Sequence, residues 1–194
     1  MPQPGLLVRL LWLAFAVSWL VLAQFNKKAS RGTPPWAGWR LRLALIFAVF
    51  ILVRFRRHAV VGFVNSMHHT LAHHPGITLQ WVGFGLCVVG FGFAVWARVH
   101  IGRNWGMPMS LREGHELVTS GPYAYVRHPI YSGLLLAMVG SVLTSGLPWL
   151  LGLILYFTYL IFAARSEEKT MLAQFPDSYP AYRSRTKMLI PFVF

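Results

Sequence analysis

Long apolar runs, separated by short clusters of basic residues, are the feature that most constrains this 194-residue chain. The first run covers residues 6–25, and a helix of that length can cross the hydrocarbon core of a bilayer. Only 12% of the residues are charged, against about 25% in a soluble domain. Because a helix satisfies its backbone hydrogen bonds internally, we expect an all-α integral membrane protein.

The apolar runs predict about five transmembrane helices. Residues 6–25, 36–55 and 77–97 give three spans, which together form an N-terminal region over residues 1–97. The last two spans form a helical hairpin over residues 129–164, with a turn at Leu147-Pro148. Residues 98–194 therefore combine a polar segment, this hairpin and a C-terminal tail.

The span at 77–97 carries small residues at helical spacing, which predicts close packing against another helix. A dinucleotide-binding loop is the alternative, but Gly83-Phe84-Gly85 lacks the third glycine of that motif. The small residues are Gly83, Cys87, Gly90, Ala94 and Ala97.

The net charge of +13 comes from 18 basic and 5 acidic residues. Because the basic residues flank apolar spans, they indicate topology and lipid contact rather than nucleic-acid binding. If the C-terminal tail is cytoplasmic, most of the basic residues fall on that side, as the positive-inside rule requires. These are Lys27, Lys28, Arg31, Arg40, Arg42, Arg98, Arg103, Arg112, Arg127, Arg165, Lys169, Arg183, Arg185 and Lys187, whereas Arg9, Arg54, Arg56 and Arg57 remain outside.

Residues 114–133 form the densest polar stretch. Gly121-Pro122 predicts a turn, and Pro129 suits the first position of a helix. Arg127 and His128 then stand just before a helix N-terminus, where free N–H groups favour an anion. The alternative is an interfacial anchor, although several polar groups entering an apolar hairpin favour a site.

Glu167 and Glu168 are two of only five acids, and they stand at the expected end of the last span. A local salt-bridged helix end, with Arg165 and Lys169, is one interpretation. Since adjacent helical residues point in different directions, we expect at most one acid to enter a shared site. The other would meet solvent or Arg165.

The C-terminal half resembles the isoprenylcysteine carboxyl methyltransferase family. The resemblance rests on residues 115–133, on Glu167-Glu168, on Tyr179-Pro180-Ala181-Tyr182 and on Leu189-Ile190-Pro191-Phe192. It implies S-adenosyl-L-methionine as the methyl donor and the C-terminal carboxylate of a prenylated cysteine as the acceptor. In the orientation that the positive-inside rule favours, the cofactor-binding region and the C-terminus would be cytoplasmic.

The resemblance also implies which residues form the site, because each can be matched to a position of the family motif. The cofactor-binding residues would be His115, Glu116, Leu117, Val118, Tyr123, His128, Pro129, Ile130, Tyr131 and Glu167. Arg127 and Glu168 are candidate catalytic residues, and Asn104 and Trp105 stay unassigned. Ala163 stands where eukaryotic members of the family have an arginine, and Arg165 is the nearest substitute on the substrate side.

Carboxyl methylation explains why the chain shows no catalytic triad, because a carboxylate acceptor is already an anion and needs no general base. Catalysis then rests on placement and on exclusion of water. One alternative is N-methylation of an ethanolamine-type phospholipid, which would need a base such as Glu168. A sterol-reductase-like NADPH enzyme and a non-enzymatic transporter or scaffold are the others.

Histidines 68, 69, 73 and 74 raise the possibility of a metal site, because His69 and His73 are one helical turn apart. No Cys, Asp or Glu lies nearby in the sequence to complete such a site. We therefore expect a solvated interfacial loop and no bound metal.

Overall fold

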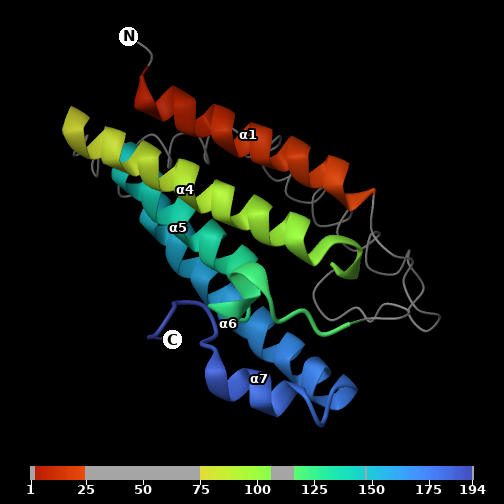
Figure 1. The fold of residues 1–194 in the computed structure, drawn as a ribbon. Coiled ribbons are helices and arrows are strands. Elements are labelled where there is room, and N and C mark those ends of the chain that lie inside the picture. Colours follow the sequence, from red (N-terminus) through yellow and green to blue (C-terminus); the bar gives the residue numbers. More distant parts are fainter. Residues whose placement is uncertain (1–2, 25–74, 106–115, 147, 194) are drawn as a thin grey trace, which may run out of the picture.

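The structure, a computed structural model, describes residues 3–24, 75–105, 116–146 and 148–193, and the regular elements within them are helices, as expected (Figure 1). In chain order the elements are α1 (Pro4–Ala23), α4 (Ile77–Ile101), the 3₁₀ turns η1 (Gly102–Asn104) and η2 (Gly121–Ala124), α5 (Pro129–Ser145), α6 (Pro148–Gln174) and α7 (Tyr179–Arg185).

Within the described residues, three helical segments are long and apolar enough to cross a membrane: Pro4–Leu22, Ile77–Ile101 and Trp149–Gln174. The protein is accordingly an integral membrane protein. Helix α5 has 17 residues, so it rises about 26 Å, somewhat less than the roughly 30 Å of a bilayer core. The expected span at 36–55 lies outside the described residues, and the count of five spans therefore stays a prediction.

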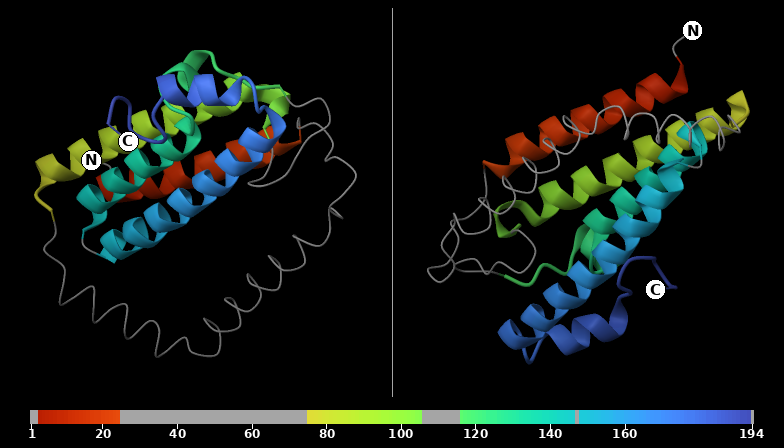
Figure 2. Two further views of the ribbon diagram at one scale, coloured as in Figure 1. Left: turned by 90° about the horizontal axis from the view of Figure 1, so that it is seen from below. Right: turned by 180° about the vertical axis from the view of Figure 1, so that it is seen from behind.

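Helices α1 and α4 run in the same direction, whereas α5 and α6 form an antiparallel hairpin packed beside them (Figures 1 and 2). The C-terminal part of α6 extends past the start of α5, and α7 folds back against it (Figure 1). The polar elements η1, η2 and α7 thus gather at one end of the bundle.

The small-residue face of α4 packs against α5, as the sequence predicts. Gly83, Cys87, Gly90, Ala94 and Ala97 are all buried. A Cβ added at Gly90 would lie 2.5 Å from the carbonyl oxygen of Gly133 and 2.6 Å from the nitrogen of Ala137. The two backbones therefore approach too closely for any larger residue at this point.

Two long-range hydrogen bonds fix α1 to this pair. The indole Nε1 of Trp12 donates to Oγ of Ser141 at 3.0 Å. The Arg98 guanidinium donates to the carbonyl oxygen of Leu22 at 2.7 Å, which satisfies a free acceptor at the end of α1. Arg98 is only 2% exposed, because α4 continues to Ile101 and does not end at the predicted residue 97.

Helix α6 also runs further than the sequence indicated. Its expected end was Ala164, but it continues to Gln174, because residues 165–174 contain good helix formers and the first proline is Pro176. The charged residues after Ala164 therefore mark a change of surroundings rather than the end of the helix. Glu167 and Glu168 consequently lie inside a regular helix.

The close approach of α4 and α5 predicts a position-specific effect of adding one methyl group. Gly90→Ala should lower the free energy of unfolding by about 1–3 kcal/mol, because the new Cβ overlaps the α5 backbone. Gly92→Ala, where the Cβ would meet nothing within 4 Å, should leave stability unchanged or raise it by up to about 1 kcal/mol. Thermal unfolding in detergent measures both, and equal effects would contradict the packing.

Candidate functional site

The turn that precedes α5 is shaped by Gly121. This residue has φ 58°, in the left-handed region that favours glycine, and a Cβ here would lie 2.6 Å from the His100 ring. The phenol of Tyr182 donates to the carbonyl oxygen of Tyr123 at 2.7 Å. Burial raises the pKa of Tyr182 to about 12, so the phenol keeps the proton that it donates.

The C-terminal tail holds the residues before α5 in an extended conformation. The backbone nitrogen of Arg127 donates to the carbonyl oxygen of Lys187 at 2.8 Å, and that of His128 donates to Met188 at 3.1 Å. The hydroxyl of Ser132 donates to the carbonyl oxygen of Leu189 at 2.5 Å. Segments about 60 residues apart in sequence thus form one structural unit.

A buried ion pair joins this unit to α6. Nε of Arg127 lies 2.6 Å from Oε1 of Glu168, and the two side chains are 10% and 7% exposed. The same guanidinium donates to the backbone carbonyls of Arg183, at 3.2 Å, and of Thr186. Arg127 is therefore occupied by protein groups on several sides, and Glu168 is buried against it instead of facing solvent.

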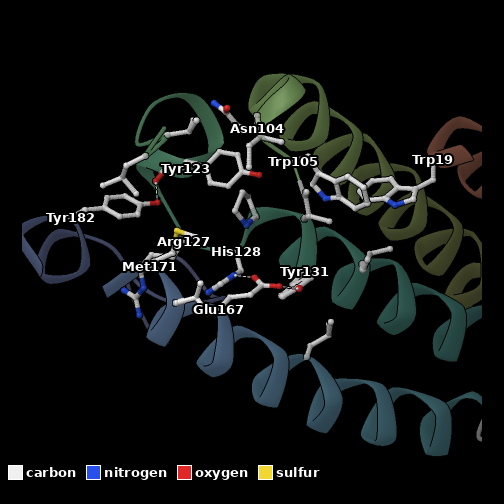
Figure 3. A pocket seen from close by; sticks show the side chains of 18 of the residues that line it. Trp19, Asn104, Trp105, Tyr123, Arg127, His128, Tyr131, Glu167, Met171 and Tyr182 are labelled. Carbon is white, nitrogen blue, oxygen red and sulfur yellow. Dashed lines mark hydrogen bonds and ion pairs between the residues drawn. The ribbon is translucent and has the colours of Figure 1, made fainter. Parts of the chain in front are cut away.

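His128 lies between the two glutamates, and Figure 3 shows it beside Glu167 and Tyr131. Its Nδ1 is 3.3 Å from Oε2 of Glu167, and its Nε2 is 3.6 Å from Oε1 of Glu168. The Tyr131 hydroxyl donates to the other oxygen of Glu167 at 2.5 Å, and the Tyr131 ring stacks on the imidazole at 5.4 Å. Both acids thus reach the same histidine, but only Glu167 lines the cavity described below, and Glu168 is paired with Arg127 rather than with solvent or Arg165.

Burial on its own would lower the pKa of His128. Hydrogen bonds and charge from Glu167 and Glu168 outweigh that effect and raise the pKa above its ordinary value. The two carboxylates therefore favour the protonated form of the imidazole.

A cavity of about 430 Å³ opens beside this cluster, within the usual size range of small-molecule sites. Nine of the ten residues expected to bind a cofactor line it: Glu116, Leu117, Val118, Tyr123, His128, Pro129, Ile130, Tyr131 and Glu167. The tenth, His115, lies outside the described residues. Arg127 also lines the cavity, whereas Glu168 and Arg165 line a separate hollow. Ala163 is fully buried.

The sequence did not identify the aromatic part of this wall. Helix α1 contributes Trp12, Phe15 and Trp19, and Trp105 follows η1. Rings of Trp19 and Trp105 meet edge to face at 5.5 Å, and the Arg98 guanidinium lies 4.6 Å from the Trp105 ring centre. The only signal in the sequence was the helical spacing of the α1 aromatics, which is equally typical of packing.

Further lining residues come from α6 and α7. These are Tyr156, Tyr159, Leu160, Thr170, Met171, Tyr179 and Tyr182. Figure 3 shows Met171 and Tyr182 near Arg127, with Trp19 and Trp105 toward the other side of His128. The cavity thus has a polar side at Glu167 and His128 and an extended aromatic side.

The phospholipid methyltransferase family model matches residues 78–178, more than half of the chain. This match includes nearly all of α4, the turn, α5 and all of α6. The chain belongs to the phospholipid methyltransferase family.

The chain is similar to curated relatives of different names, and one of them has the activity of the family that the C-terminal half resembles. A protein-S-isoprenylcysteine O-methyltransferase from Schizosaccharomyces pombe is 35% identical over 138 residues, which cover 69% of this chain and 54% of that protein. The cobalt-zinc-cadmium resistance protein CzcN of Cupriavidus metallidurans is 32% identical over 59% of this chain and 49% of its own length. This family member therefore spans about half the length of these two relatives.

A solved structure shares the fold. The eukaryotic intramembrane Ras methyltransferase, an isoprenylcysteine carboxyl methyltransferase, matches 72% of this chain and 53% of its own chain, with a TM-score of 0.56 and 23% identity. At this identity, the match shows only that the two proteins share a helical fold.

The raised pKa of His128 predicts a pH-dependent stability. An unfolded histidine titrates near about 6.5, so the stabilisation from the charged imidazole is complete below that value and is lost as pH rises through the higher folded pKa. We expect the Tm of the wild type to fall as the pH rises above the ordinary histidine pKa of about 6.5. His128→Gln, which cannot titrate, should give a flatter profile, and parallel profiles would contradict the assignment.

Proposed function

We propose that this protein is an S-adenosyl-L-methionine-dependent methyltransferase that methylates the C-terminal carboxylate of a prenylated cysteine at the membrane. The observation that carries the proposal is a single cavity in which a carboxylate–imidazole cluster faces aromatic walls beside an apolar helix. Membership of the family and the similarity to named isoprenylcysteine methyltransferases support it.

The cavity fits the chemistry of the donor. S-adenosyl-L-methionine supplies a methyl group attached to a positively charged sulfur. Aromatic faces attract such cations in a dry site, and Tyr123, Tyr131 and Trp105 are among those present. Glu167 can accept hydrogen bonds from an ammonium or a ribose hydroxyl, while its bonds to Tyr131 and His128 hold it in place.

The placement of Glu168 favours a carboxylate acceptor over an amine. An amine must lose a proton before it is methylated, and Glu168 was the residue proposed as the base. Glu168 does not line the cavity, because its oxygens face Arg127 at 2.6 Å and Arg183 at 3.6 Å. A carboxylate acceptor arrives as an anion and needs only to be positioned with water excluded.

An apolar route leads from the cavity to the outer surface of α6. Leu134, Tyr156 and Leu160 line the cavity, and so does Tyr159, which is 54% exposed. The cavity therefore reaches a face of α6 that also exposes Leu155 and Phe162. A lipid chain attached to the acceptor can lie along this face while its polar end enters the cavity. The positive-inside pattern supports a cytoplasmic location of the site.

Methyl transfer with labelled donor tests the acceptor class. Incubated with S-adenosyl-L-methionine labelled in the methyl group, the purified protein should label farnesylated cysteine and leave phosphatidylethanolamine unlabelled. A methyl ester releases labelled methanol in alkali, whereas an N-methyl group does not. Farnesylcysteine carboxamide is the matched control and should accept no label, and label found only in the phospholipid would sink the proposal.

Substitution of the two adjacent glutamates should have different effects, one mainly on donor binding and the other mainly on stability. Glu167→Gln should weaken S-adenosyl-L-methionine binding by about tenfold or more, since it removes a charged acceptor from the cavity wall, with a smaller loss of stability than Glu168→Gln. Glu168→Gln should lower the free energy of unfolding by about 3–5 kcal/mol, because it leaves a buried arginine without its partner. Calorimetric titration and thermal unfolding measure the two effects.

His128→Ala should also weaken donor binding, since it releases Glu167 from its position. Equal losses of binding in the Glu167→Gln and Glu168→Gln variants, once both are shown to be folded, would argue against separate roles for the two acids.

A further inference from the structure

A second hollow lies on the far side of the Arg127–Glu168 pair. It has a volume of about 300 Å³ and is formed by α6, α7 and the C-terminal tail. Its charged lining residues are Arg127, Arg165, Glu168, Arg183 and Lys187, and we call it the basic pocket. Four positive groups and one negative group therefore face the same small space.

The single acid of the basic pocket is already occupied. Glu168 is 2.6 Å from Arg127 and 3.6 Å from Arg183. Arg165 and Lys187 are exposed and line the same hollow. Positive charges held this close repel one another unless an anion enters, and guanidinium groups match the oxygens of a phosphate group.

The basic pocket lies where the surface of α6 changes from apolar to charged. Phe162 is 69% exposed and is the last large apolar residue on the outside of this helix. Arg165 follows three residues later, about 4.5 Å along the helix axis. In a membrane-embedded helix this is the level at which lipid headgroups meet the protein.

The end of the described chain gives a second, independent indication of a membrane surface. Ile190, Phe192 and Val193 are 48%, 88% and 72% exposed, and Val193 also lines the basic pocket. Apolar side chains beside clustered cations are typical of segments that lie in the headgroup region, with the apolar groups in the lipid and the cations on phosphates.

We propose that the basic pocket binds the phosphate of an anionic phospholipid headgroup, with the exposed tail residues resting in the adjoining lipid. A soluble anion such as free phosphate would satisfy the cations but would leave Ile190, Phe192 and Val193 in water. This inference concerns a site separate from the cavity and does not depend on the proposed methyltransferase activity.

A charge-matched pair of double variants tests the proposal. Arg165→Gln with Lys187→Gln removes two charges from the basic pocket. Lys169→Gln with Arg185→Gln removes two exposed charges from α6 and α7 that do not line it. Native mass spectrometry of the full chain, purified in micelles containing equal phosphatidylglycerol and phosphatidylcholine, counts which lipid is retained. Thermal unfolding in phosphatidylcholine alone verifies that all proteins are folded.

The wild type should retain phosphatidylglycerol in preference to phosphatidylcholine. The pocket variant should lose that preference by roughly 10- to 30-fold, at about 1 kcal/mol for each basic residue, and the control should stay within about twofold of the wild type. No preference in the wild type, or equal losses in both variants, would overturn the proposal. Displacement of the lipid by millimolar inorganic phosphate would identify a free-anion site instead and would overturn it as well.

Discussion

The ion pair between Arg127 and Glu168 is the interaction on which the rest of the polar end depends. It joins the segment before α5 to α6, and the remaining donors of Arg127 reach the backbone of Arg183 and Thr186. Burying two charges is costly unless each is compensated, and here the guanidinium is compensated by an acid and by carbonyls. Because His128 is the next residue in the chain, this pair also fixes the position of the imidazole.

The adjacent glutamates divide two tasks that one residue could not perform. Neighbouring side chains on a helix point in directions about 100° apart, so Glu168 reaches the buried arginine while Glu167 reaches the cavity. Both contact His128 because the imidazole lies between them and presents a different nitrogen to each. Because His128 contacts both carboxylates and Glu167 also lines the cavity, the imidazole holds Glu167 toward the space where a ligand would lie.

Local patterns in the sequence predicted much of the described fold, whereas the family resemblance implied the residues that form the polar side of the cavity wall. The small residues of α4 pack as expected because their spacing alone determines which face can approach another helix closely. The aromatic wall could not be predicted, since Trp12, Phe15 and Trp19 have the same spacing whether they face lipid, a neighbouring helix or a cavity. The sequence also did not predict that Arg127 pairs with Glu168. The two residues are 41 positions apart, and they meet only because α6 continues past Ala164.

Arg127 lines both hollows, so the ion pair is the partition between them. On one side lies the cavity with its carboxylate–imidazole cluster, and on the other lies the basic pocket at the level where α6 leaves the apolar region. The guanidinium of Arg127 is held in place by one carboxylate, from Glu168, and by two backbone carbonyls, from Arg183 and Thr186. A negative charge in the basic pocket would therefore meet Arg165 and Lys187, while Glu168 would continue to hold Arg127. The proposed lipid phosphate would therefore bind Arg165 and Lys187, while Arg127 stays paired with Glu168 beside the cavity.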